Sequence, residues 1–272
     1  MIYSGFTAAL ATQHGKEQAI APPLAALTGL ALAVPQDIDT DRLGTFTGEV
    51  PRPASPRDTL RMKVRLGMAA AGLPLGLASE GSFGPHPFMP FLAMGREAMI
   101  FIDGTRGIEV IEESISETTN FAALDLVPGA DVAGFLSRIG FPAHAVVLRD
   151  GGRIIKGISA PDHLDELLGS CSTKARLETD MRANLNPTRM AEIGRLATNL
   201  ARRIATPCPA CGAPGFGTRH SEAGLPCGDC GAPTTLVKTI VSGCALCRHE
   251  HHAPRPDGRI TASPAECPEC NP

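Results

Sequence analysis

Short apolar runs and helix-like patterns alternate along the first 205 residues. The apolar runs predict buried strands at 6–11, 30–34, 73–79, 98–103, 108–113, 143–149 and 153–158. Apolar residues spaced three or four apart predict helices, as in 57–71, where Leu60, Val64 and Met68 share one face. The same pattern predicts helices at 19–27, 131–139, 161–169 and 187 to about 205. This alternation is typical of α/β proteins, so we expect one α/β domain over residues 1–205.

Local signals mark the ends of several elements. Ser55-Pro56 and Asn186-Pro187 each combine an N-cap residue with proline at the first helical position. Residues 35–57, rich in Pro, Gly, Asp and Thr, predict a long functional loop. The stretch LGLASEGSFGPHPFMPF, residues 75–91, changes from an apolar run to a loop rich in glycine and proline. We therefore expect Glu80 at the end of a strand, where the loop begins.

Composition narrows the class of protein. The chain has 272 residues, of which 43% are hydrophobic, enough for one large or two small domains with a real core. A net charge of -3 argues against a general polyanion binder. The sequence shows neither an apolar run long enough for a membrane span nor a signal peptide, so we expect a cytoplasmic protein without a membrane partner.

The composition changes after Pro207, where cysteine, proline and glycine dominate. Eight of the nine cysteines lie here in Cys-x-x-Cys pairs, which in a cytoplasmic chain indicate metal binding rather than disulfides. The pairs are Cys208/Cys211, Cys227/Cys230, Cys244/Cys247 and Cys267/Cys270. Their spacing matches zinc sites in which two pairs of thiolates enclose one tetrahedral ion. We therefore expect two structural zinc ions in a double zinc-ribbon module over residues 206–272, separate from the α/β domain.

The pairing of the cysteines has two solutions. Sequential pairing, first with second and third with fourth, is the preferred prediction. A cross-braced arrangement, first with third and second with fourth, stays open. His249, His251 and His252 are alternative ligands, although solvated histidines are the simpler interpretation.

The charge of the module bears on its partner. Residues 201–272 hold seven Lys or Arg against six Asp or Glu, and eight thiolates with two zinc ions make the module net negative. Phosphate binding requires positive charge, and Phe216 is the only aromatic residue for base stacking. Nucleic acid is therefore not favoured, and a structural role or a protein partner is the better prediction.

Three segments of the first half combine into a candidate phosphate site. ATQHGKE, residues 11–17, follows the first strand and offers Thr12, Gln13 and Lys16 at a helix start, where free amides bind phosphate. The loop DIDTDRLGTFTGE, residues 37–49, offers Asp41 and Glu49. Glu80 ends a strand, where α/β sheets place their ligands. A cation for phosphate and several acids for a hard metal predict Mg²⁺–nucleotide chemistry.

A further candidate segment lies at 174–190, KARLETDMRANLNPTRM. Arg182, Asn184 and Arg189 lie before and inside a predicted helix start, where they would bind base or phosphate. A capped helix with solvated arginines is an equal alternative.

These segments resemble a known family. ATQHGKEQAI is similar to the start of inosine/xanthosine triphosphatases, and SPRDTLRMKVRLGMAAAGLPLGLASEGSF resembles their helix and following strand, over residues 6–115 in all. The family has Asn where this chain has Gln13, and Gly where it has Ser82. The whole chain also resembles an uncharacterised bacterial domain family with the same ASEGSFGPHP and TDMRANLNPTRM blocks and paired cysteines.

The first resemblance implies an inosine-triphosphatase-like fold and a nucleotide pyrophosphatase. Carried over by position, Thr12 and Lys16 would hold phosphates and Glu80 would serve the metal. Gln13 and Ser82, where the chain departs from the family, are further candidates for substrate binding. The favoured hypothesis is thus a Mg²⁺-dependent hydrolase of nucleoside triphosphates or related phosphates, with Lys16, Glu80, Asp41 and Glu49 as its catalytic set. The alternative is a non-catalytic nucleotide-binding protein whose zinc module docks a protein or nucleic-acid partner. Whether the chain is an enzyme, and whether it forms a homodimer, stays open.

Overall fold

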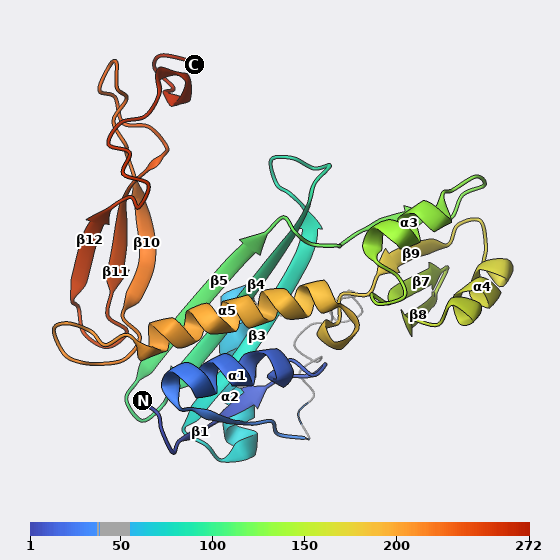
Figure 1. The fold of residues 1–272 in the computed structure, drawn as a ribbon, viewed down its shortest axis with the longest axis horizontal. Helices are drawn as coiled ribbons and strands as arrows, with labels where there is room; N and C mark the ends of the chain where they lie inside the picture. Colours follow the sequence, from blue (N-terminus) through green and yellow to red (C-terminus); the bar gives the residue numbers. More distant parts are fainter. Residues whose placement is uncertain (37, 39–54) are drawn as a thin grey trace.

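The largest sheet forms the centre of the molecule. A computed structural model describes residues 1–36, 38 and 55–272 (Figure 1). Within them the strands lie in the order β2 (Ala31–Ala33), β1 (Thr7–Ala11), β3 (Leu75–Pro85), β4 (Ala93–Asp103) and β5 (Ile108–Ser116). β1 runs parallel to β2 and β3, whereas β3, β4 and β5 are antiparallel. The mixed sheet agrees with the predicted α/β class.

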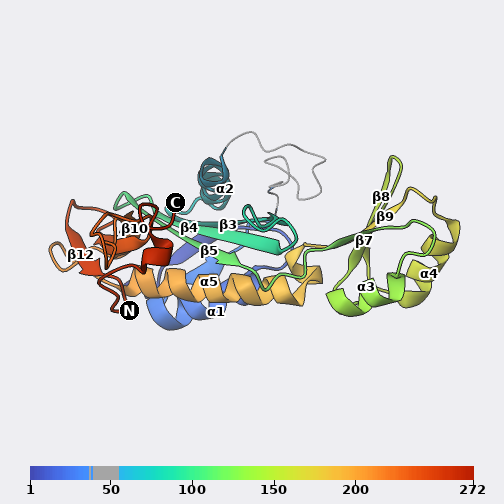
Figure 2. The ribbon, with the colours of Figure 1, turned by 90° about the horizontal axis from the view of Figure 1, so that it is seen from above.

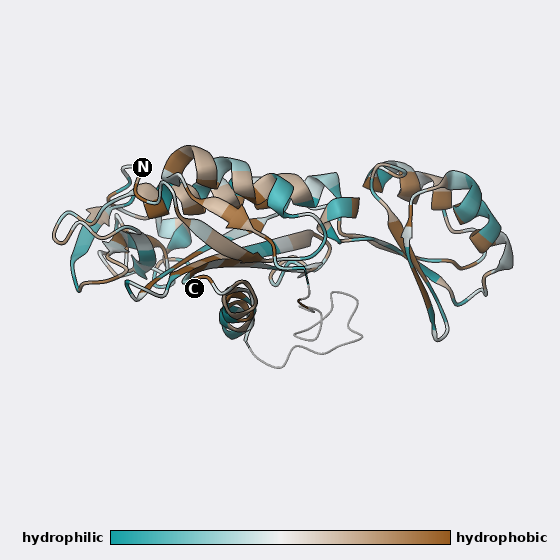
Figure 3. Cartoon of the chain, turned by 90° about the horizontal axis from the view of Figure 1, so that it is seen from below, coloured by the Kyte–Doolittle hydropathy of each residue, from teal (hydrophilic) through white to brown (hydrophobic). Residues whose placement is uncertain are grey.

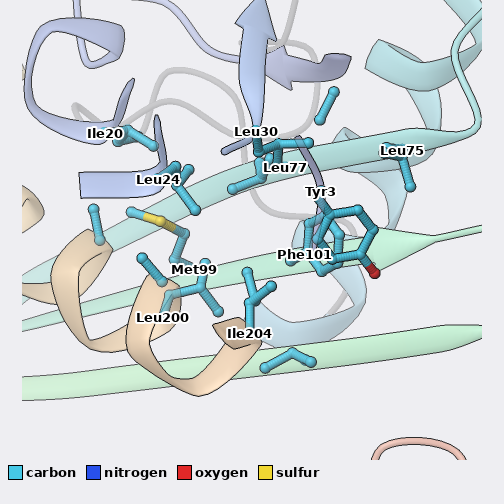
Figure 4. Packing of buried hydrophobic residues seen from close by; sticks show 14 of the residues in the cluster. Tyr3, Ile20, Leu24, Leu30, Leu75, Leu77, Met99, Phe101, Leu200 and Ile204 are labelled. Atoms are coloured by element: carbon cyan, nitrogen blue, oxygen red, sulfur yellow. The ribbon is translucent and has the colours of Figure 1, made fainter. Parts of the chain in front are cut away.

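Helices cover both faces of this main sheet. Figure 2 shows α1 (Glu17–Thr28) and α5 (Pro187–Ala205) below it and α2 (Pro56–Ala71) above it. Successive strand residues point to opposite faces. Leu77 therefore packs in the core under α1 and α5, and Ala78 packs in the core under α2. Figure 4 shows the first of these cores, where the ring of Tyr3 meets that of Phe101 edge to face at 5.3 Å.

Residues 1–205 contain a second sheet that the sequence did not distinguish. This second lobe comprises β6 (Ala123–Asp125), α3 (Val132–Ile139), β7 (Val146–Asp150), β8 (Arg153–Ile158), α4 (Pro161–Ser170) and β9 (Arg176–Thr179). Its strands lie in the order β6-β9-β7-β8 and its hydrophobic core is separate, with Phe135 and Leu177 fully buried. The expected single α/β domain thus folds around separate cores, and the lobe stands at the far end of the main sheet (Figure 1).

Asn186 joins the second lobe to α5. It is fully buried, and its Nδ2 donates to Asn120 Oδ1 at 2.9 Å and to the Asp180 carbonyl at 3.1 Å. Its Oδ1 accepts from Arg189 N at 3.0 Å, which confirms the predicted helix cap. One side chain therefore fixes both chain crossings between the lobes and the start of α5. Along the described residues, no helix combines the length and apolarity that a bilayer crossing needs.

The cysteine-rich region forms a small antiparallel sheet, with strands in the order β10 (Gly217–Ala223), β11 (Val237–Gly243) and β12 (Glu250–Pro254). Figure 3 shows this region as more hydrophilic than the brown strands of the main sheet. A module this small buries too little apolar surface to be stable by itself. Small modules of this kind are commonly stabilised by a bound metal ion.

The structure corrects the expected end of the strand at Glu80. β3 pairs with β4 without a break from Leu75↔Asp103 to Pro85↔Ala93, so Glu80 lies inside a strand, opposite Ala98. The glycines that suggested a loop are accommodated within this ladder. Helix α1 also begins earlier than expected, at Glu17, and Pro22 and Pro23 lie inside it.

Candidate functional site

Buried charged side chains gather around residues 79–81 of β3. Lys16 comes from the loop after β1, Lys63 from α2, Glu80 from β3, Glu97 from β4 and Arg189 from α5. Each is at most 9% exposed. Buried charges are rare in proteins and are retained where they are paired or functional. We call these residues the charge cluster, which carries three positive and two negative groups.

Ion pairs organise the cluster on the two faces of the sheet. Glu80 pairs with Lys63 on the α2 face. On the opposite face, Arg189 Nε donates to Glu97 Oε1 at 2.7 Å, and Arg189 Nη1 donates to the Met181 carbonyl. Glu97 Oε2 is buried and has no hydrogen-bond partner among the described residues.

The second of these pairs explains why glycine follows Glu80. Gly81 lies opposite Glu97 in the ladder. A Cβ atom at position 81 would lie 2.4 Å from Arg189 Nη2 and 2.5 Å from Glu97 Oε1. Glycine therefore leaves room for the ion pair to lie directly over the strand. At Gly84, by contrast, a Cβ would meet nothing within 4 Å.

Lys16 is the cation with the most perturbed pKa. Its Nζ donates to Ser79 Oγ at 3.1 Å. Burial first, and then the nearby positive charge of Arg189, lower the pKa of Lys16 to about 8, although Glu97 and Glu80 act in the opposite direction. Ser79 and Glu80 are neighbours in β3, so their side chains point to opposite faces of the sheet. Lys16, which contacts Ser79, therefore lies on the face opposite the Glu80 carboxylate. The five charges thus surround one short strand segment rather than facing a single open cleft.

The other predicted site residues divide into those near the cluster and those elsewhere. A Cβ at Gly15 would lie 3.8 Å from Asn184 Cβ, so Asn184 lies beside the loop that carries Lys16. Ser82 lines a small hollow together with Glu80 and Arg96. Arg182 instead pairs with Asp180, with 2.6 Å between Nη2 and Oδ2, beside Gly157 in the second lobe.

Thr12 and Gln13 both donate to backbone carbonyl groups. Thr12 Oγ1 donates to the Gln13 carbonyl at 3.0 Å, and Gln13 Nε2 donates to the Ile38 carbonyl at 3.2 Å. Asp41 and Glu49 lie outside the described residues.

Sequence reasoning missed Lys63 and Glu97, although each left a signal. Lys63 lies on the buried stripe of α2 between Leu60 and Val64, where a charge is unusual. Glu97 lies two and four residues before the buried Met99 and Phe101 in β4. Because side chains alternate along a strand, Glu97 is expected on the same buried face as these two residues. A charge at an apolar position of a periodic pattern indicates a buried partner.

The cysteines meet in two groups of four among the described residues. The proximal group, next to α5, contains Cys208, Cys211, Cys244 and Cys247, and the distal group contains Cys227, Cys230, Cys267 and Cys270. The preferred sequential pairing is therefore wrong, and the cross-braced alternative is correct. The segment between each cysteine pair and the next contains one strand of the antiparallel sheet β10-β11-β12. Successive cysteine pairs therefore lie at opposite ends of this sheet. First and third pairs must then meet at one end, and second and fourth at the other.

The spacing of the sulfur atoms fits zinc. A tetrahedral ion with zinc–sulfur bonds of about 2.3 Å places its ligands about 3.8 Å apart. The Sγ···Sγ distances are 3.8 Å for Cys208–Cys247 and 3.6 Å for Cys211–Cys244. In the distal group they are 3.8 Å for Cys227–Cys270 and 3.7 Å for Cys230–Cys267. These distances exclude disulfides, and both groups fit structural zinc sites.

Backbone geometry supports the same assignment. Gly212 and Gly231, each directly after a cysteine pair, have φ of 72° and 73°. This left-handed turn, which glycine adopts without strain, brings Gly212 N to the Cys208 carbonyl at 2.8 Å. The amides of Leu246 and Cys247 donate to Cys244 Sγ, both at 3.2 Å.

Comparison with known proteins identifies a family without a known activity. Residues 63–272 match the profile of a domain of unknown function, DUF6671. The chain belongs to the DUF6671 family. The matched region includes Lys63, Glu80, Glu97, Arg189 and all eight paired cysteines, whereas Lys16 precedes it. No curated protein and no solved structure matches the chain.

Proposed function

We propose that this DUF6671 protein binds a nucleotide or a related phosphate at the charge cluster and hydrolyses it with Mg²⁺. The observation that supports this proposal is the concentration of buried charge around residues 79–81 of β3. Of the charged residues that are buried in the described part of the chain, only Asp103 and Asp180 lie outside the cluster. With three cations against two carboxylates, the cluster has one uncompensated positive charge that a bound phosphate would balance.

The loop before α1 adds anion-binding groups. Lys16 immediately precedes α1, whose N-terminus carries partial positive charge from its unpaired amides. His14 and Gly15 both have φ of 67°, which turns the loop sharply at this point. Phosphate oxygens held here would lie beside the Lys16 ammonium group and Asn184.

Mg²⁺ fits this site only together with the phosphate. Among the described residues, no group of three or more acidic or histidine ligands meets near Glu80. Mg²⁺ commonly uses one or two carboxylates, with water and substrate phosphate oxygens completing its shell. Glu80 would supply such a carboxylate, and the ion would offset charge on the phosphate. Lys16 would stabilise negative charge on the phosphate. Lys63, which pairs with Glu80, would hold that carboxylate in place.

A larger hollow adjoins the cluster and would hold the organic part of the ligand. Glu97 and Arg189 line a water-sized space together with Thr119 and Thr188. The same two threonines line a hollow of about 400 Å³ between the main sheet and the second lobe. Phe91, Phe121 and Arg138 also line it. Its size and mixed apolar and polar lining are those of small-molecule sites.

A nucleotide screen with Mg²⁺ tests the proposal, with pyrophosphate and phosphate release followed separately. We expect Lys16→Met and Glu80→Gln to lower turnover by roughly a hundredfold or more, as expected for a lost transition-state contact. Lys174→Met, which removes an exposed lysine of the second lobe, is the matched control and should have no effect. Full activity in Glu80→Gln would exclude the catalytic role of this carboxylate. Binding of pyrophosphate without turnover in the wild type would favour the non-catalytic alternative.

A further inference from the structure

The two cysteine groups lie in different surroundings. Cys208 and Cys244 of the proximal group belong to the same hydrophobic core as Ile204 of α5 and Val110 of β5. In the described part of the chain, no cysteine of the distal group belongs to a hydrophobic core cluster. Figure 1 shows the distal end of the module extending away from the main sheet.

Tight packing covers one side of the proximal group, where Cys208 and Cys244 are buried. A Cβ at Gly215 would lie 2.6 Å from Val110 Cγ2, so the cysteine module is pressed directly against β5. Arg203, in the last turn of α5, donates to the Ile111 carbonyl at 3.0 Å and to Glu112 at 2.7 Å. Opening the proximal group would therefore break contacts of α5 and β5 as well as metal bonds.

The ring of Phe216 packs beside the proximal group as well. It stacks on His249 with 5.8 Å between ring centroids, two residues beyond Cys247. His249 thus packs on a ring beside the proximal group, while all four positions of that group are filled by sulfur.

The distal group has much less support. Cys230 and Cys270 are exposed, and Leu225 and Ala262 are the buried apolar residues near it. The two chain segments that carry the distal cysteines are joined mainly by backbone hydrogen bonds. In one of them, Ala262 N donates to the Pro226 carbonyl at 2.8 Å. The nearby Arg259–Glu266 pair is exposed on both sides, and exposed pairs of this kind stabilise little.

We propose that the distal group is an exchangeable zinc site and that the tip it closes folds only when zinc is bound. Release of a buried ion requires local opening, whose free energy rises with the packing that must be broken. The distal group can open with the loss of few contacts, whereas the proximal group opens only together with the end of α5. Residues 224–236 and 255–272 therefore form a tip that responds to zinc supply, while the proximal zinc stays with the main sheet. This inference does not depend on the proposed hydrolase activity.

Zinc release from the intact full-length protein tests the proposal. A chromogenic zinc chelator in excess should remove one ion per chain in a fast phase and the second at least about tenfold more slowly. Hydrogen exchange measured after the fast phase should show lost protection in 224–236 and 255–272, with protection kept along α5. Equal release rates for both ions, or loss of protection in α5 during the fast phase, would overturn the proposal.

Matched single substitutions assign the phases. Cys230 and Cys211 are the exposed second members of their pairs in the distal and proximal groups. Cys230→Ser should abolish the fast phase and leave the unfolding of the main sheet unchanged. Cys211→Ser should retain the fast phase and lower the unfolding temperature. Retention of the fast phase in Cys230→Ser would contradict the assignment even if Cys211→Ser failed to fold.

Discussion

A single methyl group at position 81 tests whether the Glu97–Arg189 ion pair organises the site. In Gly81→Ala the new Cβ would lie 2.4 Å from Arg189 Nη2 and 2.5 Å from Glu97 Oε1. Both contacts are far shorter than van der Waals distance, and β3 is paired along its length with β4, so the backbone cannot move aside alone. We therefore expect the ion pair to separate, which leaves buried charges without partners.

The size of the effect follows from burial. The side chains of Arg189 and Glu97 are 7% and 4% exposed, so neither reaches water when the pair separates. Removing one partner of a buried pair destabilises a protein by about 3–5 kcal/mol, and this figure is the upper limit for Gly81→Ala, in which both partners remain. For a chain of this size, that loss corresponds to a decrease of roughly 10 °C in the unfolding temperature. Thermal unfolding followed by circular dichroism and urea titration would measure both quantities.

Gly84 of the same strand is the matched control. A Cβ there meets nothing within 4 Å, so Gly84→Ala should cost little or stabilise slightly, because alanine suits a strand better than glycine. If Glu97→Ala and Arg189→Met are introduced first, Gly81→Ala should lose most of its effect. Wild-type stability in Gly81→Ala, or an equal loss in Gly84→Ala, would refute the reasoning.

Further predictions concern the zinc ions, Lys16 and the helix cap. Elemental analysis of protein purified without added metal should give two zinc ions per chain, and a reproducible ratio near one, or iron instead, would contradict this. Because the pKa of Lys16 is lowered to about 8, phosphate affinity measured by calorimetry should fall as the pH rises through 8, and Lys16→Met should lose that dependence. Between pH 8 and 10.5, Lys16 binds more protons in the unfolded chain than in the folded protein. The contribution of Lys16 to the free energy of unfolding therefore rises with pH in that window. Asn186→Ala removes a cap and the link between lobes, and should lower stability by about 1–2 kcal/mol in urea titration, whereas an unchanged midpoint would exclude the linking role.

Patterns confined to neighbouring residues were sufficient to locate several elements. The apolar stripe and the Ser55 cap placed α2, and Asn186-Pro187 placed the start of α5. The cysteine spacing identified the zinc ligands, since two thiolates three residues apart can enclose one side of an ion wherever the rest of the chain lies. The short strands β6 and β9 gave no signal, because a few residues with mixed polarity carry no measurable period.

Only the tertiary structure decided which distant residues meet. The extent of β3 depended on pairing with β4, which outweighed the local turn preference of its glycines. The cross-braced cysteine groups depended on three antiparallel strands that return the chain to alternate ends. Residues 16, 63, 80, 97 and 189 come together from five segments, and no one of these segments shows which of the other charges it meets. The sequence by itself therefore determined local elements and metal-ligand chemistry. The partners within the charge cluster depend on long-range contacts, which a local pattern does not specify.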